Sequence, residues 1–367
     1  MFDRRLIQNF DWFILLVLLG IAGASILNLY SATFPIKEQA ASHVFVRQIY
    51  WYCLGFGAFI IMTTFNYFRL ERLAYPAYFV SVALLVLVLI IGKISSGSQR
   101  WLSLGPISFQ PSELVKISLV LALARFFSEK KEFKEYRLRD LWMPFGLILG
   151  PFILVVKEPD LGTALLLVMV GASVVFLAKI HWKSILILVI AVVVLAPFVW
   201  LHLQPYQQRR IMTFLRPDMD PLGAGYHINQ SKIAIGSGLL WGKGFLQGTQ
   251  TRLHFLPEQH TDFAFSVWAE EWGFSGALFL LGLYFLIILW GMHIARNSKD
   301  KFGAMLAVGI TSIIFWQVVI NVGMVTGLLP VVGIPLVLFS YGGSSLVSTM
   351  AALGILMNIR MRRFMFQ

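Results

Sequence analysis

Ten apolar segments follow one another along the chain, each close to the roughly 17 to 25 residues that a helix needs to cross a bilayer. They lie near residues 11–31, 47–66, 74–93, 110–127, 142–157, 160–180, 184–201, 263–292, 303–328 and 335–359. Only 13% of the 367 residues are charged, whereas a soluble domain carries roughly 25%. We therefore predict an all-α polytopic membrane protein with about ten transmembrane helices, and not a disordered or disulfide-stapled secreted chain.

The formal net charge is +12, but the 30 Lys and Arg residues lie between the apolar segments rather than in one basic domain. This distribution is typical of membrane topology signals, so we expect no nucleic-acid partner. With both termini in the cytoplasm, 18 basic residues fall inside and 12 outside. Six of those 12 lie in one long loop, which the positive-inside rule weights lightly. We therefore predict a multi-pass protein with both termini cytoplasmic.

Cys53, the single cysteine, lies in an apolar segment. An intrachain disulfide and a cysteine-based metal site are thereby excluded, and redox chemistry is not expected. The first apolar segment has no A-x-A cleavage site before the next polar stretch, so we interpret it as a retained span rather than a signal peptide.

Residues 202–262 form the only extended polar segment of the chain. A segment of this length exceeds what a simple connection requires, and such loops are often functional. We predict a large extracytoplasmic loop between helices 7 and 8, within a single transmembrane domain that comprises residues 1–367.

The first candidate site precedes the fourth apolar segment, in QRWLSLGPISFQPSELVK. Glu113 and Lys116 are three residues apart and share one helical face, so they form either a self-neutralising ion pair at the helix start or a pair beside a substrate pathway. Arg100, beside Trp101, either contacts a phosphate or anchors the segment at the headgroup level.

The second candidate site is the short turn VVKEPDLGTA, with Lys157 and Asp160 on either side of Glu158 and Pro159. Pro159 and Gly162 explain the turn by themselves. The alternative is a functional one, because a lysine between carboxylates at a membrane edge suits an anionic headgroup or a cation.

The third candidate site is the densest acidic cluster on the predicted outer side, FLPEQHTDFAFSVWAEEWGF. The spacing of Glu258, His260 and Asp262 gives little support to a metal site, because ligands two residues apart converge only in a strand or a loop. Thr261 or Asp262 is expected to cap the eighth helix. The functional interpretation is a general base at the membrane surface.

The fourth candidate site is the stretch NVGMVTGLLPVVGIPLVLFSYGGSS, in which glycine and proline interrupt the apolar sequence between the last two spans and within the last one. Interrupted backbone in lipid is tolerated only where it is buried in protein or lines a cavity. Ser340 and Ser344 therefore suit close helix packing or a polar cavity. Motifs for nucleotide binding, dinucleotide redox chemistry, zinc proteolysis and serine hydrolysis do not occur.

These segments, together with RIMTFLRPDMDPLGAGYHINQSKIAIGSG and GKGFLQGTQTRLHFLPEQHTDF, resemble the SEDS family of bacterial cell-wall polymerases over essentially the whole chain. The stretch GYHINQSKIAIGSG followed by GTQ is more similar to the elongation branch of the family than to its division branch. The chain departs from the usual pattern at Val337, where a proline is common, and at Leu239 and Leu240, where glycines are common.

The resemblance implies a ten-span enzyme that polymerises lipid II on the outer face of the bacterial cytoplasmic (inner) membrane. It also implies a class B penicillin-binding protein as the transpeptidase partner, within the elongation machinery. The family's essential acidic residue corresponds to Asp262 of HTDF, and its functionally important pair beside the central cavity corresponds to Glu113 and Lys116.

Chemistry agrees with this assignment, because a glycan held through pyrophosphate already has a good leaving group and needs only one base. Asp262 is the candidate base. The cations available for the departing pyrophosphate are Arg100, Lys116, Lys157, Arg209 and Arg210. The sequence requires no cofactor, although a divalent cation, Mg²⁺ or Mn²⁺, could assist. A lipid II flippase and a non-catalytic scaffold for the penicillin-binding protein are the alternative functions.

Overall fold

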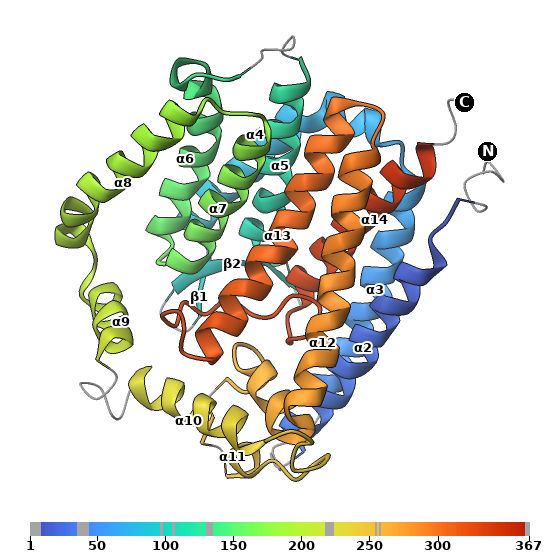
Figure 1. Cartoon of the computed structure of the whole chain (residues 1–367), viewed down its shortest axis with the longest axis vertical. Helices are drawn as coiled ribbons and strands as arrows, with labels where there is room; N and C mark the ends of the chain where they lie inside the picture. Colours follow the sequence, from blue (N-terminus) through green and yellow to red (C-terminus); the bar gives the residue numbers. More distant parts are fainter. Residues whose placement is uncertain are drawn as a thin grey trace.

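The computed structural model describes residues 9–34, 44–95, 98–104, 107–129, 135–216, 224–253, 255–256 and 258–363, which form a helical bundle (Figure 1). A helix lies in each of the ten predicted apolar segments. These helices are α2 (Trp12–Thr33), α3 (Val44–Thr64), α4 (Tyr67–Ile91), α5 (Pro111–Glu129), α6 (Trp142–Lys157), α7 (Leu161–Leu177), α8 (Trp182–His202), α12 (Ala264–Asn297), α13 (Lys301–Val325) and α14 (Gly343–Arg362). The predicted all-α membrane fold is confirmed.

Seven helices of the described chain are long and apolar enough to cross a membrane, so the predicted number of ten spans is not confirmed. The helices α7 and α8 are apolar but shorter by this measure. The remaining helix, α5, carries four charged residues, which lower its apolar character: Glu113, Lys116, Arg125 and Glu129.

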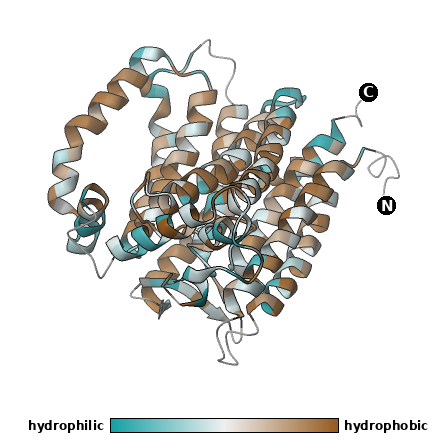
Figure 2. Cartoon of the chain, turned by 60° about the horizontal axis from the view of Figure 1, so that its bottom comes forward, coloured by the Kyte–Doolittle hydropathy of each residue, from teal (hydrophilic) through white to brown (hydrophobic). Residues whose placement is uncertain are grey.

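The most buried helices form the centre of the bundle. In this core α13 packs against α5, α7 and α12, while α14 packs against α3. By contrast, α8 stands apart from the bundle (Figure 1), and its residues are apolar along most of its length (Figure 2). Most side chains of α8 are exposed, as expected for a helix whose surroundings are lipid.

The two ends of the described chain meet at one end of the bundle. Asp11, which caps α2, forms an ion pair with Arg360 in the last turn of α14. Trp290 of α12 donates a hydrogen bond to the same carboxylate at 2.9 Å. This arrangement agrees with an even number of membrane crossings.

A small antiparallel sheet, which was not predicted, precedes α5. It consists of β1 (Lys93–Ser95), β2 (Ser98–Leu104) and β3 (Ile107–Phe109), in that order. Lys93 pairs with Trp101 across β1 and β2, so these two side chains share one face of the sheet.

The predicted loop of residues 202–262 also contains secondary structure, although residues 217–223, 254 and 257 lie outside the described residues. Its helices are α9 (Pro205–Leu215), α10 (Ala224–Ser237) and α11 (Thr249–Arg252), and a 3-10 turn, η1 (Leu138–Leu141), precedes α6.

The helix α12 is two helices joined at Gly273, whose φ of 64° is in the left-handed region. The Trp268 indole N–H donates to the Gly276 carbonyl at 2.8 Å, a hydrogen bond that bridges the kink. The main-chain N–H of Phe274 donates to Leu239 O at 2.8 Å. The kink therefore lies against the segment between α10 and α11, while the first residues of α12 remain in the interior.

The last helix begins at Gly343, eight residues later than the predicted 335, because residues 331–342 have no regular helical structure. Gly333 has a φ of 73° and Leu338 a φ of 66°, which interrupt any helix. Buried donors satisfy part of this irregular backbone: Ser25 Oγ donates to Phe339 O at 2.6 Å and Gln48 Nε2 donates to Ser340 O at 3.2 Å. The segment is thus irregular backbone buried in protein.

Candidate functional site

A cavity of about 450 Å³, which we call the central cavity, lies where β2, α5, α7, α9 and the segment before α14 meet. Eight of the twelve candidate residues line it: Arg100, Glu113, Lys116, Asp160, Arg210, Glu258, Asp262 and Ser344. They come from positions as far apart as 100 and 344, so tertiary packing assembles the site.

The main-chain carbonyl of Asp262 is fixed by a hydrogen bond, whereas its side-chain carboxylate has no hydrogen-bond partner among the described residues. Asn321 Nδ2 donates to Asp262 O at 3.0 Å. The preceding turn is fixed because Tyr341 N donates to His260 O at 2.9 Å. The Asp262 carboxylate accepts no hydrogen bond from any residue that the structure describes. The prediction that Thr261 or Asp262 caps the eighth helix is wrong, because Phe263 occupies the N-cap and no side chain bonds there.

The surroundings of Asp262 suit a general base. Burial raises its pKa to about 6, and the negative charge of Glu258 acts in the same direction. The positive charges of Arg210 and Arg100 oppose this shift. A carboxylate with a pKa of about 6 is ionised at neutral pH and is a stronger base than an ordinary aspartate.

Glu113 and Lys116 form a buried ion pair in the wall of the central cavity, with 2.8 Å between Lys116 Nζ and Glu113 Oε1. Both side chains are less than a tenth exposed. Gln317, from α13, lines the same wall, and its Oε1 is buried with no hydrogen-bond partner. The pair is therefore self-neutralising and also borders the cavity, so the two sequence interpretations do not exclude each other.

Arg100 is fixed toward the turn between α6 and α7. Its guanidinium lies 3.4 Å from Asp160 Oδ2 and donates to Pro159 O at 2.6 Å. Asp160 also caps α7, accepting from Thr163 N at 3.1 Å. Glu158 in this turn is buried, and burial together with the charge of Asp160 raises its pKa to about 8. The turn thus positions Arg100 at the cavity.

Arg210 enters the central cavity from α9. Its guanidinium lies over the Tyr206 ring at 5.8 Å, and the Tyr206 hydroxyl donates to Pro159 O at 3.5 Å. Three candidate residues line neither the central cavity nor the second cavity described below. Lys157 and Arg209 are exposed, and buried Ser340 accepts a hydrogen bond from Leu336 N at 3.0 Å. Ser340 is therefore structural, as close packing would require.

The acidic cluster of the sequence is divided in space. Glu258 and Asp262 line the central cavity, whereas Glu270 is fully buried near the kink of α12. Glu270 Oε1 accepts from Lys243 Nζ at 2.6 Å and from Thr249 N at 2.8 Å. Glu270 therefore holds the α10 to α11 segment in place and does not face the cavity.

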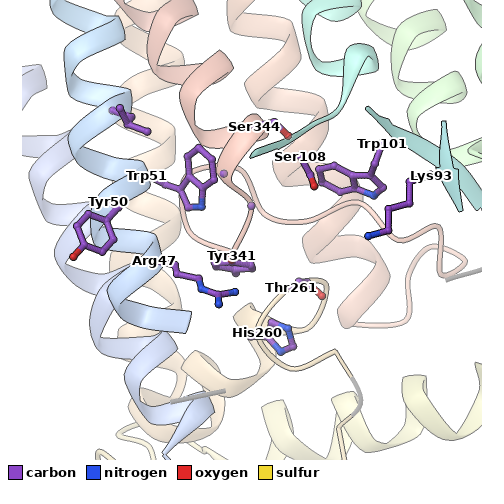
Figure 3. A pocket seen from close by; sticks show the side chains of 13 residues that line it. Arg47, Tyr50, Trp51, Lys93, Trp101, Ser108, His260, Thr261, Tyr341 and Ser344 are labelled. Atoms are coloured by element: carbon purple, nitrogen blue, oxygen red, sulfur yellow. The ribbon is translucent and has the colours of Figure 1, made fainter. Parts of the chain in front are cut away.

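Figure 3 shows a second cavity of about 760 Å³, which we call the aromatic cavity. It borders the central cavity, because the two share several lining residues. The candidate His260 lines it, and burial lowers the pKa of this imidazole. Sequence reasoning missed Arg47, Lys93, Trp51 and Tyr341, which line the same cavity. Arg47 and Lys93 carried no distinguishing signal, because basic residues at span ends are ordinary topology determinants.

A metal site made of protein ligands alone does not occur among the described residues, which gather no group of three or more His, Cys, Asp or Glu side chains able to hold an ion. Within the central cavity, Glu113 is bound to Lys116, and Asp160 to Arg100 and Thr163. Glu258 accepts a hydrogen bond from the Thr261 hydroxyl at 3.2 Å. Mg²⁺ is commonly held by one or two carboxylates together with substrate phosphates, so these residues fit an ion only when a phosphorylated substrate is present.

Comparison with known proteins agrees with this architecture. The family of FtsW, RodA and SpoVE, described as cell cycle protein, matches residues 10–364. The chain is 44% identical to peptidoglycan glycosyltransferase MrdB of Escherichia coli K12, over 97% of this chain and 95% of that protein.

Two solved structures are also similar. One is RodA of Thermus thermophilus, a rod shape determining protein, with 32% identity, a TM-score of 0.72 and coverage of 97% of this chain and 98% of that one. The other is a chain from a peptidoglycan synthase complex that coordinates polymerization and crosslinking, with 34% identity, a TM-score of 0.83 and the same coverage. The chain therefore belongs to the SEDS family of FtsW, RodA and SpoVE and is of the RodA type.

Proposed function

We propose that the chain is a peptidoglycan glycosyltransferase that polymerises lipid II, with Asp262 as its general base. The observation that carries the proposal is a free, half-buried carboxylate in a cavity that also presents the cations of Arg100 and Arg210. The relatives MrdB and RodA support the reaction class, since MrdB is named a peptidoglycan glycosyltransferase.

In the proposed reaction, the 4-hydroxyl of the acceptor sugar transfers its proton to the Asp262 carboxylate. The hydroxyl oxygen forms a bond to C1 of the donor sugar, and the bond between C1 and the pyrophosphate oxygen breaks. The electron pair leaves with the polyprenyl pyrophosphate. Attack opposite the leaving group inverts C1, and no second carboxylate is needed.

The remaining charged residues of the central cavity act on the substrate's charge. Arg100 and Arg210 attract the negative charge of the bound substrate on the side of Asp262. Arg100 is held by its hydrogen bond to Pro159 O, and Arg210 lies over the ring of Tyr206, whose hydroxyl donates to the same carbonyl. The Glu113 and Lys116 pair shapes the wall of the cavity. A divalent cation, Mg²⁺ or Mn²⁺, would be held by Glu258 together with phosphate oxygens of the bound substrate, and would neutralise part of the negative charge in the central cavity.

The proposed setting is the bacterial cytoplasmic membrane, with both termini in the cytoplasm and the central cavity on the outer side. The proposed partner is a class B penicillin-binding protein of the elongation machinery. The similarity to a chain of a peptidoglycan synthase complex supports such a partner.

The test is polymerisation of labelled lipid II by purified protein, with and without a cognate class B penicillin-binding protein. We expect glycan polymer from the wild type and none from a folded Asp262→Asn variant. Glu135→Gln is the matched control, because this carboxylate is exposed and lies outside both cavities. Absence of polymer from the wild type under every condition would instead favour lipid transport or a scaffold.

A further inference from the structure

The aromatic cavity has no role in the mechanism above, yet it is larger than the central cavity and continuous with it. We propose that it is the donor subsite, in which Arg47 and Lys93 bind the pyrophosphate that leaves. This inference rests on the proposed glycosyltransferase function.

The two cavities meet at the candidate base. Five residues line both of them: Trp101, Thr261, Tyr341, Gly342 and Ser344. One turn lies between the two cavities, since His260 lines the aromatic cavity, Asp262 lines the central one and Thr261 lines both. A sugar ring at this boundary would have the base on one side and the aromatic cavity on the other, as in-line displacement at C1 requires.

The charges of the two linings differ. The central cavity contains four carboxylates and three cationic side chains: Glu113, Asp160, Glu258, Asp262, Arg100, Lys116 and Arg210. The aromatic cavity contains Arg47 and Lys93 and no carboxylate among the residues that line it. Negative charge that grows on the leaving pyrophosphate is therefore stabilised better in the aromatic cavity.

Arg47 and Lys93 are available for a ligand. Neither side chain forms a hydrogen bond or an ion pair with another residue that the structure describes, and both residues are exposed. They extend into the cavity from opposite sides, Arg47 from α3 and Lys93 from β1 (Figure 3). Two cations that face each other across a cavity match a pyrophosphate, which carries several acceptor oxygens.

The rest of the lining fits a sugar and a polyprenyl chain. Trp51, Trp101 and Tyr341 offer aromatic faces around the cavity. Tyr50 and Leu54 extend the lining along α3, where they are 66% and 57% exposed. Ile61, 63% exposed, continues the same face seven residues after Leu54, so an apolar chain can lie along α3 below a headgroup at Arg47.

The test compares three variants in detergent or nanodiscs with the wild type. In the double variant Arg47→Gln with Lys93→Gln, we expect polymerisation at saturating lipid II to fall about 100-fold. The double variant Arg47→Lys with Lys93→Arg keeps both charges and should retain most of the rate. Arg252→Gln removes an exposed cation of α11 that lines neither cavity, and should leave the rate unchanged.

A binding measurement separates this inference from the proposed function. Undecaprenyl pyrophosphate is titrated against the Asp262→Asn protein, and bound lipid is counted by native mass spectrometry, with phosphatidylglycerol as competitor. We expect the Gln double variant to lose one bound pyrophosphate lipid that phosphatidylglycerol does not displace. Equal binding and an unchanged polymerisation rate in that variant would overturn the donor subsite, as would displacement by phosphatidylglycerol. Wild-type protein that makes no polymer would overturn the proposed function instead.

Discussion

The Asn321 side chain joins Asp262 to the irregular segment before α14, because its Nδ2 donates to Asp262 O at 3.0 Å and to Ile334 O at 2.8 Å. Asn321 is fully buried, so no solvent replaces these bonds. One amide group therefore fixes two parts of the central cavity, and it acts on the base through the main chain.

Asn321→Ala should lower kcat at least tenfold and leave KM nearly unchanged, because Asp262 loses its position while the cationic residues keep theirs. Each buried carbonyl left without a donor also costs about 1 to 3 kcal/mol. Steady-state polymerisation kinetics and thermal unfolding would measure both effects. Asn321→Asp removes the donor at constant size and should behave like the alanine variant; normal kcat in both would contradict a positioning role.

The polymerisation rate should follow ionisation of Asp262. Burial and Glu258 raise its pKa to about 6. The rate should therefore be nearly flat above pH 7 and fall about tenfold per pH unit below 6. A pH profile of kcat/KM checks this. In Glu258→Gln the raising charge is absent, so the midpoint should move to lower pH, and a midpoint that stays fixed would argue against Asp262 as the titrating group.

The same pKa predicts a cost in stability. Because the folded-state pKa of Asp262 lies above its unfolded value, its contribution to stability is complete at pH values below the unfolded pKa and is lost as the pH rises through about 6. Asp262→Asn should therefore unfold at a higher temperature than the wild type at pH 7.5, with the difference vanishing near pH 4. Melting curves at the two pH values test this, and a less stable Asn variant at pH 7.5 would contradict it.

The Glu113 and Lys116 pair offers a test of its two interpretations. Lys116→Met leaves the buried Glu113 carboxylate unpaired and should destabilise the protein by about 3 to 5 kcal/mol. The double variant Glu113→Met with Lys116→Met removes both charges and should recover most of that stability. Polymerisation that stays low in the stable double variant would assign the pair to the substrate, whereas recovery of activity would make it purely structural.

Gly333 lies opposite the candidate base with a φ of 73°, and a Cβ there would be 3.3 Å from Asp262 Oδ2. Gly333→Ala should lower stability by about 1 to 2 kcal/mol through backbone strain and reduce kcat by moving the carboxylate. Gly236→Ala is the matched control, since a Cβ at Gly236 meets nothing within 4 Å. Equal activity of the two variants would show that Asp262 tolerates a shift.

The sequence predicted the helices well because each one must satisfy its own backbone in lipid, which requires a long apolar run that is visible locally. It predicted the glycine and proline interruptions before and within the last span, but it began the last helix at residue 335, whereas residues 335–342 are irregular backbone held by Ser25 and Gln48. The polar donors that make this possible lie some 300 residues away in sequence, and no local pattern indicates them.

By itself, then, the sequence predicted an all-α membrane fold and the local Glu113 and Lys116 pair, and its resemblance to the SEDS family indicated Asp262 as the candidate base. Only the tertiary structure decided that Asp262 lines a cavity and does not cap the helix, whose N-cap is Phe263. It also decided that Arg47 and Lys93 line a second cavity. The reason is physical: helix formation and i, i+3 pairs depend on neighbours along the chain. A cavity depends on which faces of distant elements remain uncovered after packing, and that is decided by the whole fold.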